Sequence, residues 1–183
     1  MRVITGSCRG KKLKTLESLD TRPTTDMVKE AVFSIIQFDV PASSVLDLFA
    51  GSGQMGIEAL SRGASHCVFV DSNPEAVAIV KDNVASCGFN KESRVLCMDS
   101  LEYLKVAKAG LDIVFIDPPY RMGIEKALEL VESKLNDGAI IVCEHEKELE
   151  LGESYGRLKL HKRYKYGKTA LTVYKIPMKE VDY

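Results

Sequence analysis

Short apolar runs alternate with segments of helical periodicity through the middle of the chain, and this alternation narrows the possible folds more than any other feature. Apolar runs occupy residues 45–50, 66–70, 94–97, 111–116 and 139–143, and helical patterns lie between them over 54–62, 74–86, 100–108 and 123–135. Strands that are apolar at every position are typical of a parallel sheet with helices on both faces. We therefore predict an α/β fold, and the length of 183 residues suits a single domain.

Both ends of the chain are expected to add a hairpin to this core. Strand-like runs separated by turn residues occupy about 2–5, 11–16, 157–166 and 169–176. Two such runs at each end predict one antiparallel hairpin at each end. We accordingly divide the domain of residues 1–183 into an N-terminal hairpin extension, residues 1–25, and a catalytic core, residues 26–183.

The formal net charge of −1 conceals two basic ends and an acidic centre. Residues 1–22 carry a net charge of +4, residues 23–154 carry −11 and residues 155–183 carry +6. Such an asymmetry indicates a polyanionic partner held by the ends. Within the acidic centre, the run Glu144–Glu150 is expected to form an exposed face.

Composition excludes several classes of protein. Hydrophobic residues make up 45% of the chain and charged residues 28%, which is typical of a folded domain. No apolar run approaches the roughly 18 residues of a membrane-spanning helix, and the N-terminus becomes polar too early for a signal peptide. The five cysteines form no C-x-x-C motif. We therefore expect a cytoplasmic protein without disulfides or structural zinc.

A glycine-rich turn follows the first apolar run. Gly51, Gly53 and Gly56 match the G-x-G-x-x-G pattern of dinucleotide sites. Asp47 lies four residues before Gly51, however, and a carboxylate beside the turn would repel a pyrophosphate. A cationic amino-acid cofactor such as S-adenosylmethionine would be attracted to the same carboxylate. The alternative is a tight strand-to-helix turn with a solvated Asp47.

Two further carboxylates follow apolar runs of the core. Asp71 lies 20 residues after Gly51, where a carboxylate can bind both hydroxyls of a ribose. Asp99 follows the third run and could accept a hydrogen bond from an adenine amino group. Each has a structural alternative, because Asp71-Ser72-Asn73 and Asp99-Ser100 both precede helical segments and could cap them.

A second turn, Asp117-Pro118-Pro119-Tyr120, follows the fourth apolar run. The prolines fix the backbone and cannot donate hydrogen bonds, so nearby carbonyls point outward rigidly. A carboxylate and a carbonyl can together accept both hydrogens of an exocyclic amino group, which directs the nitrogen lone pair at an electrophile. Tyr120 offers a face on which an extruded base can stack. Since no cysteine neighbours this turn in the sequence, a covalent mechanism of cytosine-C5 methylation is disfavoured.

These segments resemble one family, the bacterial 16S ribosomal RNA guanine-N2-methyltransferases of the RsmD type. The motifs that carry the resemblance are Asp-Leu-Phe-Ala-Gly-Ser-Gly at 47–53, Gly-Ile-Glu-Ala-Leu-Ser-Arg-Gly-Ala at 56–64, Asp-Pro-Pro-Tyr at 117–120, Arg9–Leu13, Arg22–Ala31 and Tyr166-Gly-x-Thr169. They cover nearly the whole chain. Asp-Pro-Pro-Tyr alone is shared with adenine-N6 and cytosine-N4 DNA methyltransferases, whereas the segment beginning at Arg22 is far more specific.

The resemblance implies an S-adenosylmethionine-dependent methyltransferase (Rossmann-like) fold with a seven-stranded, mostly parallel sheet and a C-terminal antiparallel hairpin. It implies methyl transfer from S-adenosylmethionine to N2 of a guanine in 16S ribosomal RNA, either free or within an assembling small subunit, without a metal. The implied catalytic residues are Asp117, Pro118, Pro119 and Tyr120. The implied cofactor contacts are Asp47, Phe49, Ala50, Gly51, Ser52, Gly53, Asp71, Ser72, Asn73, Asp99, Ser100 and Asp117. We expect a monomer.

Cations and aromatic residues at the two ends are candidates for contacts to RNA, because this combination suits phosphates and stacked bases. The candidates are Arg9, Lys11, Lys12, Arg22, Thr24, Arg121, Lys162, Arg163, Lys165, Tyr166 and Lys168. The alternative is ordinary solvated lysines and arginines on two hairpins.

Three other functions remain open from the sequence. An adenine-N6 or cytosine-N4 methyltransferase would use the same Asp-Pro-Pro-Tyr turn on a different base, in DNA or RNA. An NAD(P)-dependent oxidoreductase would use the glycine pattern but has no role for residues 117–120. A non-catalytic RNA-binding module would use the basic ends alone.

Overall fold

Eight strands form one sheet in the part of the chain that the structure, a computed structural model, describes: residues 1–16, 26–119 and 123–178. The strands are β1 (Ser44–Asp47), β2 (His66–Asp71), β3 (Ser93–Cys97), β4 (Leu111–Ile116), β5 (Leu135–Glu146), β6 (Ser154–Tyr155), β7 (Leu158–Tyr166) and β8 (Thr169–Lys175). The helices are α1 (Asp26–Ile35), α2 (Gln54–Ser61), α3 (Pro74–Cys87), α4 (Ser100–Val106) and α5 (Ile124–Val131), followed by a 3-10 turn η1 (Glu132–Lys134). No helix within these ranges has the length and apolar character needed to cross a bilayer.

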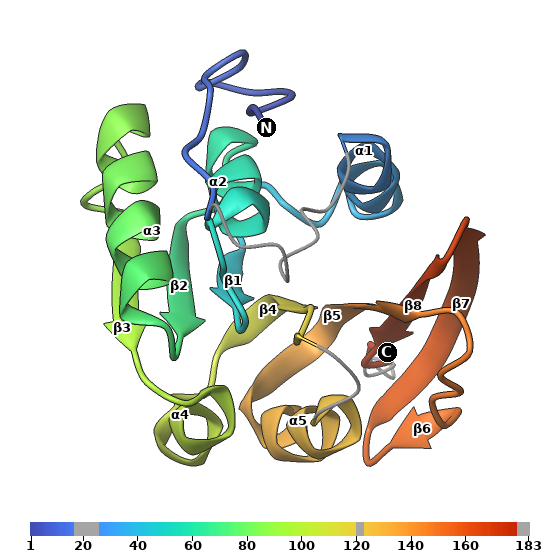
Figure 1. Ribbon diagram of the computed structural model, residues 1–183. Coiled ribbons are helices and arrows are strands. Elements are labelled where there is room, and N and C mark those ends of the chain that lie inside the picture. The colour runs from blue at the N-terminus through green and yellow to red at the C-terminus, as the bar shows by residue number, and fades with distance from the viewer. Residues whose placement is uncertain (17–25, 120–122, 179–183) are drawn as a thin grey trace, which may run out of the picture.

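The strands follow the order β3-β2-β1-β4-β5-β8-β7-β6 across the sheet. The first five are parallel and the last three pair antiparallel, which confirms the parallel core and the closing hairpin. Helices α1, α2 and α3 cover one face, and α4 and α5 cover the other (Figure 1). Each face buries its own cluster of apolar side chains, which explains why the parallel strands are apolar at every position.

Two expectations about the strands are wrong in detail. The sheet has eight strands rather than seven, because the two-residue β6 pairs with the start of β7. The N-terminal hairpin has one antiparallel bridge, between Arg2 and Lys12, and no regular strand. Val3 N–H donates to Lys11 and Leu13 N–H donates to Met1 across the hairpin. The N–H groups of Ile4 and Thr5 donate to the side chain of Glu58 on α2.

The chain order of the strands creates a crevice between β1 and β4. From β1 the chain moves outward to β2 and β3, then returns to form β4 on the other side of β1. Ligands of parallel α/β sheets bind at such a switch point, outside the carboxyl ends of the strands. Three of the carboxylates that the sequence singles out lie at this edge, because Asp47 ends β1, Asp71 ends β2 and Asp117 follows β4.

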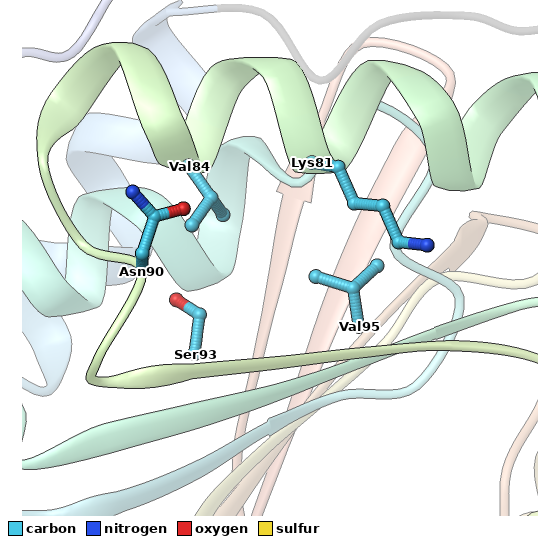
Figure 2. A pocket seen from close by; sticks show the side chains of 5 residues that line it. All are labelled: Lys81, Val84, Asn90, Ser93 and Val95. Atoms are coloured by element: carbon cyan, nitrogen blue, oxygen red, sulfur yellow. The ribbon is translucent and has the colours of Figure 1, made fainter.

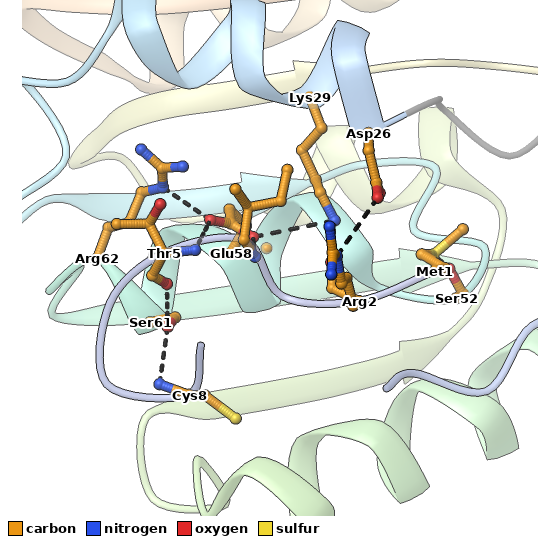
Figure 3. Close-up of polar contacts among 12 residues, drawn as sticks. Met1, Arg2, Thr5, Cys8, Asp26, Lys29, Ser52, Glu58, Ser61 and Arg62 are labelled. Atoms are coloured by element: carbon orange, nitrogen blue, oxygen red, sulfur yellow. Dashed lines mark hydrogen bonds and ion pairs between the residues drawn. The ribbon is translucent and has the colours of Figure 1, made fainter. Parts of the chain in front are cut away.

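A buried carboxylate joins the N-terminal segment to α1 and α2 (Figure 3). One oxygen of Glu58 accepts from Ile4 N–H at 2.8 Å and lies 3.9 Å from the ammonium of Lys29. The other accepts from Thr5 N–H at 3.0 Å and from Arg62 Nε at 2.8 Å. The side chains of Glu58 and Lys29 are fully buried, and this burial lowers the pKa of Lys29.

We expect the Glu58→Ala variant to lose about 3–5 kcal/mol of stability, because it leaves the Lys29 ammonium buried without its counter-charge. Urea unfolding monitored by circular dichroism measures the change. The matched control is Glu129→Ala on α5, which removes an exposed partner of Lys126 and should change stability by less than about 0.5 kcal/mol. Equal effects of the two substitutions would contradict a structural role for Glu58.

Candidate active site

A cleft of about 710 Å³ opens at the carboxyl ends of the parallel strands. Its volume is within the roughly 300–1,000 Å³ typical of ligand sites. The sequence-predicted residues that line it are Asp47, Phe49, Ala50, Gly51, Ser52, Asp71, Ser72, Asn73, Ser100, Asp117, Pro118, Pro119 and Lys168. The structure therefore brings together two turns, residues 49–52 and 117–119, that are far apart in the sequence, whereas Gly53 is not among the residues that line the cleft.

A second, smaller cavity lies between α3 and β3 (Figure 2). It has a volume of about 220 Å³ and is lined by Lys81, Val84, Asn90, Ser93 and Val95. The lysine is the single titratable side chain among them. Because this cavity lies away from the switch point and lacks carboxylates, we place the functional site in the larger cleft.

Asp47 is a buried carboxyl group at the floor of the cleft. Its Oδ2 accepts a hydrogen bond from Gly56 N–H at 3.0 Å, which joins the end of β1 to the first turn of α2. Burial raises the pKa of Asp47, the hydrogen bond from Gly56 N–H opposes the rise and the nearby charge of Asp71 adds to it, so that the pKa is about 7. A cationic group bound in the cleft would therefore stabilise the ionised form of Asp47.

Asp71 holds the glycine-rich loop in place. Its Oδ2 accepts from Gly51 N–H at 2.8 Å, and its Oδ1 accepts from Asn73 N–H at 2.9 Å. Asn73, rather than Asp71, caps α3 by accepting from Glu75 N–H. The half-buried Asp71 carboxylate thus lies at the cleft wall, beside the loop, and not in a helix cap.

The amides of the three pattern glycines are already used within the protein. Gly51 N–H donates to Asp71, Gly56 N–H donates to Asp47, and Gly53 N–H donates to the carbonyl of Ala50 at 2.6 Å. A pyrophosphate would meet two carboxylates here rather than available amide donors, which argues against a dinucleotide site. Gly56 serves close packing, because a Cβ there would lie 2.3 Å from a ring carbon of Phe69.

Asp99 has a structural role in the described chain. Its Oδ1 accepts from the N–H groups of Leu101 and Glu102, both at 2.9 Å, and so caps α4. It is exposed and is not among the residues that line the cleft. Its neighbour Ser100 does line the cleft and donates from Oγ to the carbonyl of Leu48. The contact from Asp99 to an adenine stays a prediction.

The Asp117-Pro118-Pro119 turn forms another wall of the cleft, next to Phe115. Tyr120 and Arg121 lie outside the described residues. The structure does place a cysteine beside this turn, since Cys143 on β5 pairs with Ile116 on β4. Cys143 packs in the apolar cluster on the α4 and α5 face and does not line the cleft, and burial raises the pKa of its thiol. It is therefore not placed to attack a base in the cleft.

Sequence reasoning missed the part of the cleft formed by β5 and by the N-terminal segment. Glu144, His145 and Glu146 line it, and the first two are half-buried rather than part of an exposed acidic face. Met1 and Thr15 also line it. A signal was present, because Glu144 directly follows the fifth apolar run, as Asp71 and Asp117 follow theirs.

The predicted RNA contacts lie in two separate places. Lys168, in the turn between β7 and β8, lines the cleft, while Lys162, Arg163 and Lys165 are exposed on β7 and Tyr166 is half-buried against the core. Arg9, Lys11 and Lys12 are exposed on the N-terminal hairpin and do not line the cleft. Arg9 follows Cys8, whose N–H donates to Ser61 Oγ at the end of α2. Arg22 and Thr24 lie outside the described residues.

Known proteins are similar to this chain in sequence and in fold. A family model described as "Conserved hypothetical protein 95" matches residues 1–175. A Bacillus subtilis protein named "Putative rRNA methyltransferase YlbH" is 42% identical over 181 residues, covering 96% of this chain and 98% of that protein. The Escherichia coli "Ribosomal RNA small subunit methyltransferase D" is 33% identical over 177 residues, covering 95% of this chain and 89% of that protein.

Solved structures confirm the expected methyltransferase fold. The structure "Putative methyltransferase yhhF from Escherichia coli" superposes with a TM-score of 0.85 at 31% identity, covering 98% of this chain and 99% of that chain. An RNA methyltransferase from Salinibacter ruber in complex with S-adenosyl-L-homocysteine has a TM-score of 0.67, covering 88% and 97% of the two chains. At 16% identity, this second likeness shows the fold alone.

The raised pKa of Asp47 predicts a specific dependence of stability on pH. Between its ordinary value of 3.8 and about 7, the folded protein binds a proton that the unfolded chain has lost. The free energy of unfolding therefore falls as the pH rises through this window and levels off above it. The Asp47→Asn variant does not titrate and keeps an acceptor for Gly56 N–H. Relative to the parent, it should gain on the order of 3 kcal/mol between about pH 4 and pH 8.

Urea unfolding of both proteins across this pH range measures the gain. A difference between parent and variant that stays constant with pH would contradict a raised pKa at Asp47.

Proposed function

The chain belongs to the family described as "Conserved hypothetical protein 95", and from this premise we propose that it transfers a methyl group from S-adenosylmethionine to N2 of a guanine in 16S ribosomal RNA. The names of two relatives, which refer to ribosomal RNA methyltransferases, support the reaction class. The observation that carries the proposal is the meeting of Asp47, Asp71 and the Asp117-Pro118-Pro119 turn in one cleft.

The residues of the cleft fit S-adenosylmethionine. The cofactor is cationic at its sulfonium and its α-ammonium, and it supplies a methyl group already activated for transfer. The buried Asp47 and the half-buried Asp71 provide negative charge near the glycine-rich loop, and Asp71 is held where a ribose could be bound. Gly51 has no atoms within 4 Å of where a Cβ would stand, so the loop leaves open space there.

The Asp117 turn supplies the groups that would hold the acceptor. The carboxylate of Asp117 and the carbonyl of Pro118 can accept the two hydrogens of an exocyclic amino group, which leaves the nitrogen lone pair directed at the methyl group. The Asp117 carboxylate can also take the proton that the nitrogen loses. Because the electrophile is activated by its own charge, the protein's contribution is mainly position and orientation.

The other functions have less support. An oxidoreductase is disfavoured because the amides of the pattern glycines already donate to Asp71, Asp47 and Ala50. A purely RNA-binding module leaves the cleft without a role. Adenine-N6 or cytosine-N4 methylation uses the same chemistry, and the names of the relatives favour ribosomal RNA as the substrate. Mapping the methylated nucleotide in ribosomal RNA that lacks the modification tests the choice of base.

Substitution of Asp117 by alanine should reduce the methyl-transfer rate at least about 100-fold, since the amino group loses a charged acceptor that orients it. The affinity for S-adenosylhomocysteine should stay within about threefold, because the loop carboxylates are unchanged. Incorporation of labelled methyl groups into ribosomal RNA and calorimetric titration measure the two quantities. Near-normal turnover in Asp117→Ala would exclude this mechanism.

The Lys168→Glu variant should bind ribosomal RNA more weakly, because Lys168 is a cation at the rim of the cleft. Loss of one phosphate contact lowers the slope of log K against log salt concentration by about 0.9. The matched control is Lys126→Glu on α5, because Lys126 is exposed and does not line the cleft. Filter binding at several salt concentrations should separate the two variants, and an identical loss in both would show that only net charge matters.

A further inference from the structure

We propose that Glu144 selects guanine by accepting a hydrogen bond from N1–H of the base, beside the amino group held by Asp117. This inference rests on the proposed function and assigns the specificity of the same cleft to one side chain. It concerns the wall formed by β5, which lies outside the two turns that the sequence motifs mark.

Strand register places Glu144 next to Asp117. Ile116, the last residue of β4, pairs with Cys143 on the adjacent parallel strand β5. Asp117 therefore leaves β4 beside Glu144, which still belongs to β5. Adjacent strands lie about 4.8 Å apart. Two neighbouring donors on one base edge can therefore each form an ordinary hydrogen bond, one to the Asp117 carboxylate and the other to the Glu144 carboxylate.

Side-chain alternation places both groups on the same face of the sheet. Phe115 and Val142 belong to the apolar cluster under α1, α2 and α3, whereas Ile116 and Cys143 belong to the opposite cluster. Asp117 and Glu144 follow Phe115 and Val142 by two positions, so they share the face on which Asp47 lies. All three carboxylates line the same cleft, and Glu144 is half-buried there.

The chemistry of the base edges makes this position decisive. In guanine two ring nitrogens flank the amino group, and one of them, N1, carries a hydrogen and donates, while the other, N3, accepts. In adenine and cytosine the ring nitrogen beside the amino group carries no hydrogen and accepts. A carboxylate is acceptor-only when ionised. It therefore stabilises guanine next to Asp117 and repels the lone pair that adenine or cytosine would present there.

The test compares two acceptor bases in the parent protein and in Glu144→Ala. One is 16S ribosomal RNA with guanine at the mapped methylation position, and the other carries 2-aminopurine there. This analogue keeps the amino group at C2 but has no hydrogen on N1. In the parent, kcat/KM for guanine should exceed that for 2-aminopurine by at least about tenfold. Glu144→Ala should lower the value for guanine by about 10- to 100-fold and change the value for 2-aminopurine by less than about twofold.

Two controls separate specificity from folding. S-adenosylhomocysteine should bind Glu144→Ala as it binds the parent, and Glu148→Ala, which removes an exposed carboxylate outside the cleft, should leave both rates unchanged. An equal fall for both bases, or loss of discrimination in Glu146→Ala instead, would overturn the assignment of Glu144. If the parent formed no N2-methylguanine, the proposed function itself would be wrong. If the parent methylates guanine N2 and Glu144→Ala discriminates between the two bases as the parent does, only the role of Glu144 would be refuted.

Discussion

Hydrogen bonds from main-chain amides to the carboxylates of Asp47 and Asp71 hold the glycine-rich loop, and the shape of the cleft depends on them. One bond joins the end of β1 to α2 and the other joins the end of β2 to the loop. Together they connect two adjacent parallel strands to the helix that follows the first of them. Since the same carboxylates face the cleft, the groups that fix its geometry also provide its charge.

This arrangement is electrostatically unfavourable until a cation binds. Burial disfavours the ionised form of Asp47, and the neighbouring charge of Asp71 acts in the same direction. A bound cationic ligand would remove this penalty, so the negative charge of the cleft complements the positive charge of the proposed cofactor. The acidic centre of the chain has a net charge of −11 over residues 23–154. It contains the groups that would hold a cofactor and an amino group, while both terminal segments carry a net positive charge.

The N-terminal segment is fastened to the core rather than free to act as an independent arm. Glu58 accepts hydrogen bonds from two main-chain N–H groups of this segment. Gly6 lies so close to the end of α2 that a Cβ on it would lie 1.8 Å from the carbonyl oxygen of Ser61. The segment therefore brings Met1 and Thr15 to the cleft while its tip, with Arg9, lies near the far end of α2. An RNA that contacts both basic segments has to extend well beyond the cleft.

The sequence by itself determined the order of the elements, the parallel core and the carboxylates at the strand ends, because apolar periodicity and turn residues are local properties. It also identified both turns of the cleft. Only the tertiary structure decided that Cys143 and Glu144 lie beside the Asp117 turn, and that Lys168 reaches the cleft while Arg9 does not. These facts depend on strand register and on packing between distant segments. Both are set by contacts that form only when the chain has folded, so no local pattern encodes them.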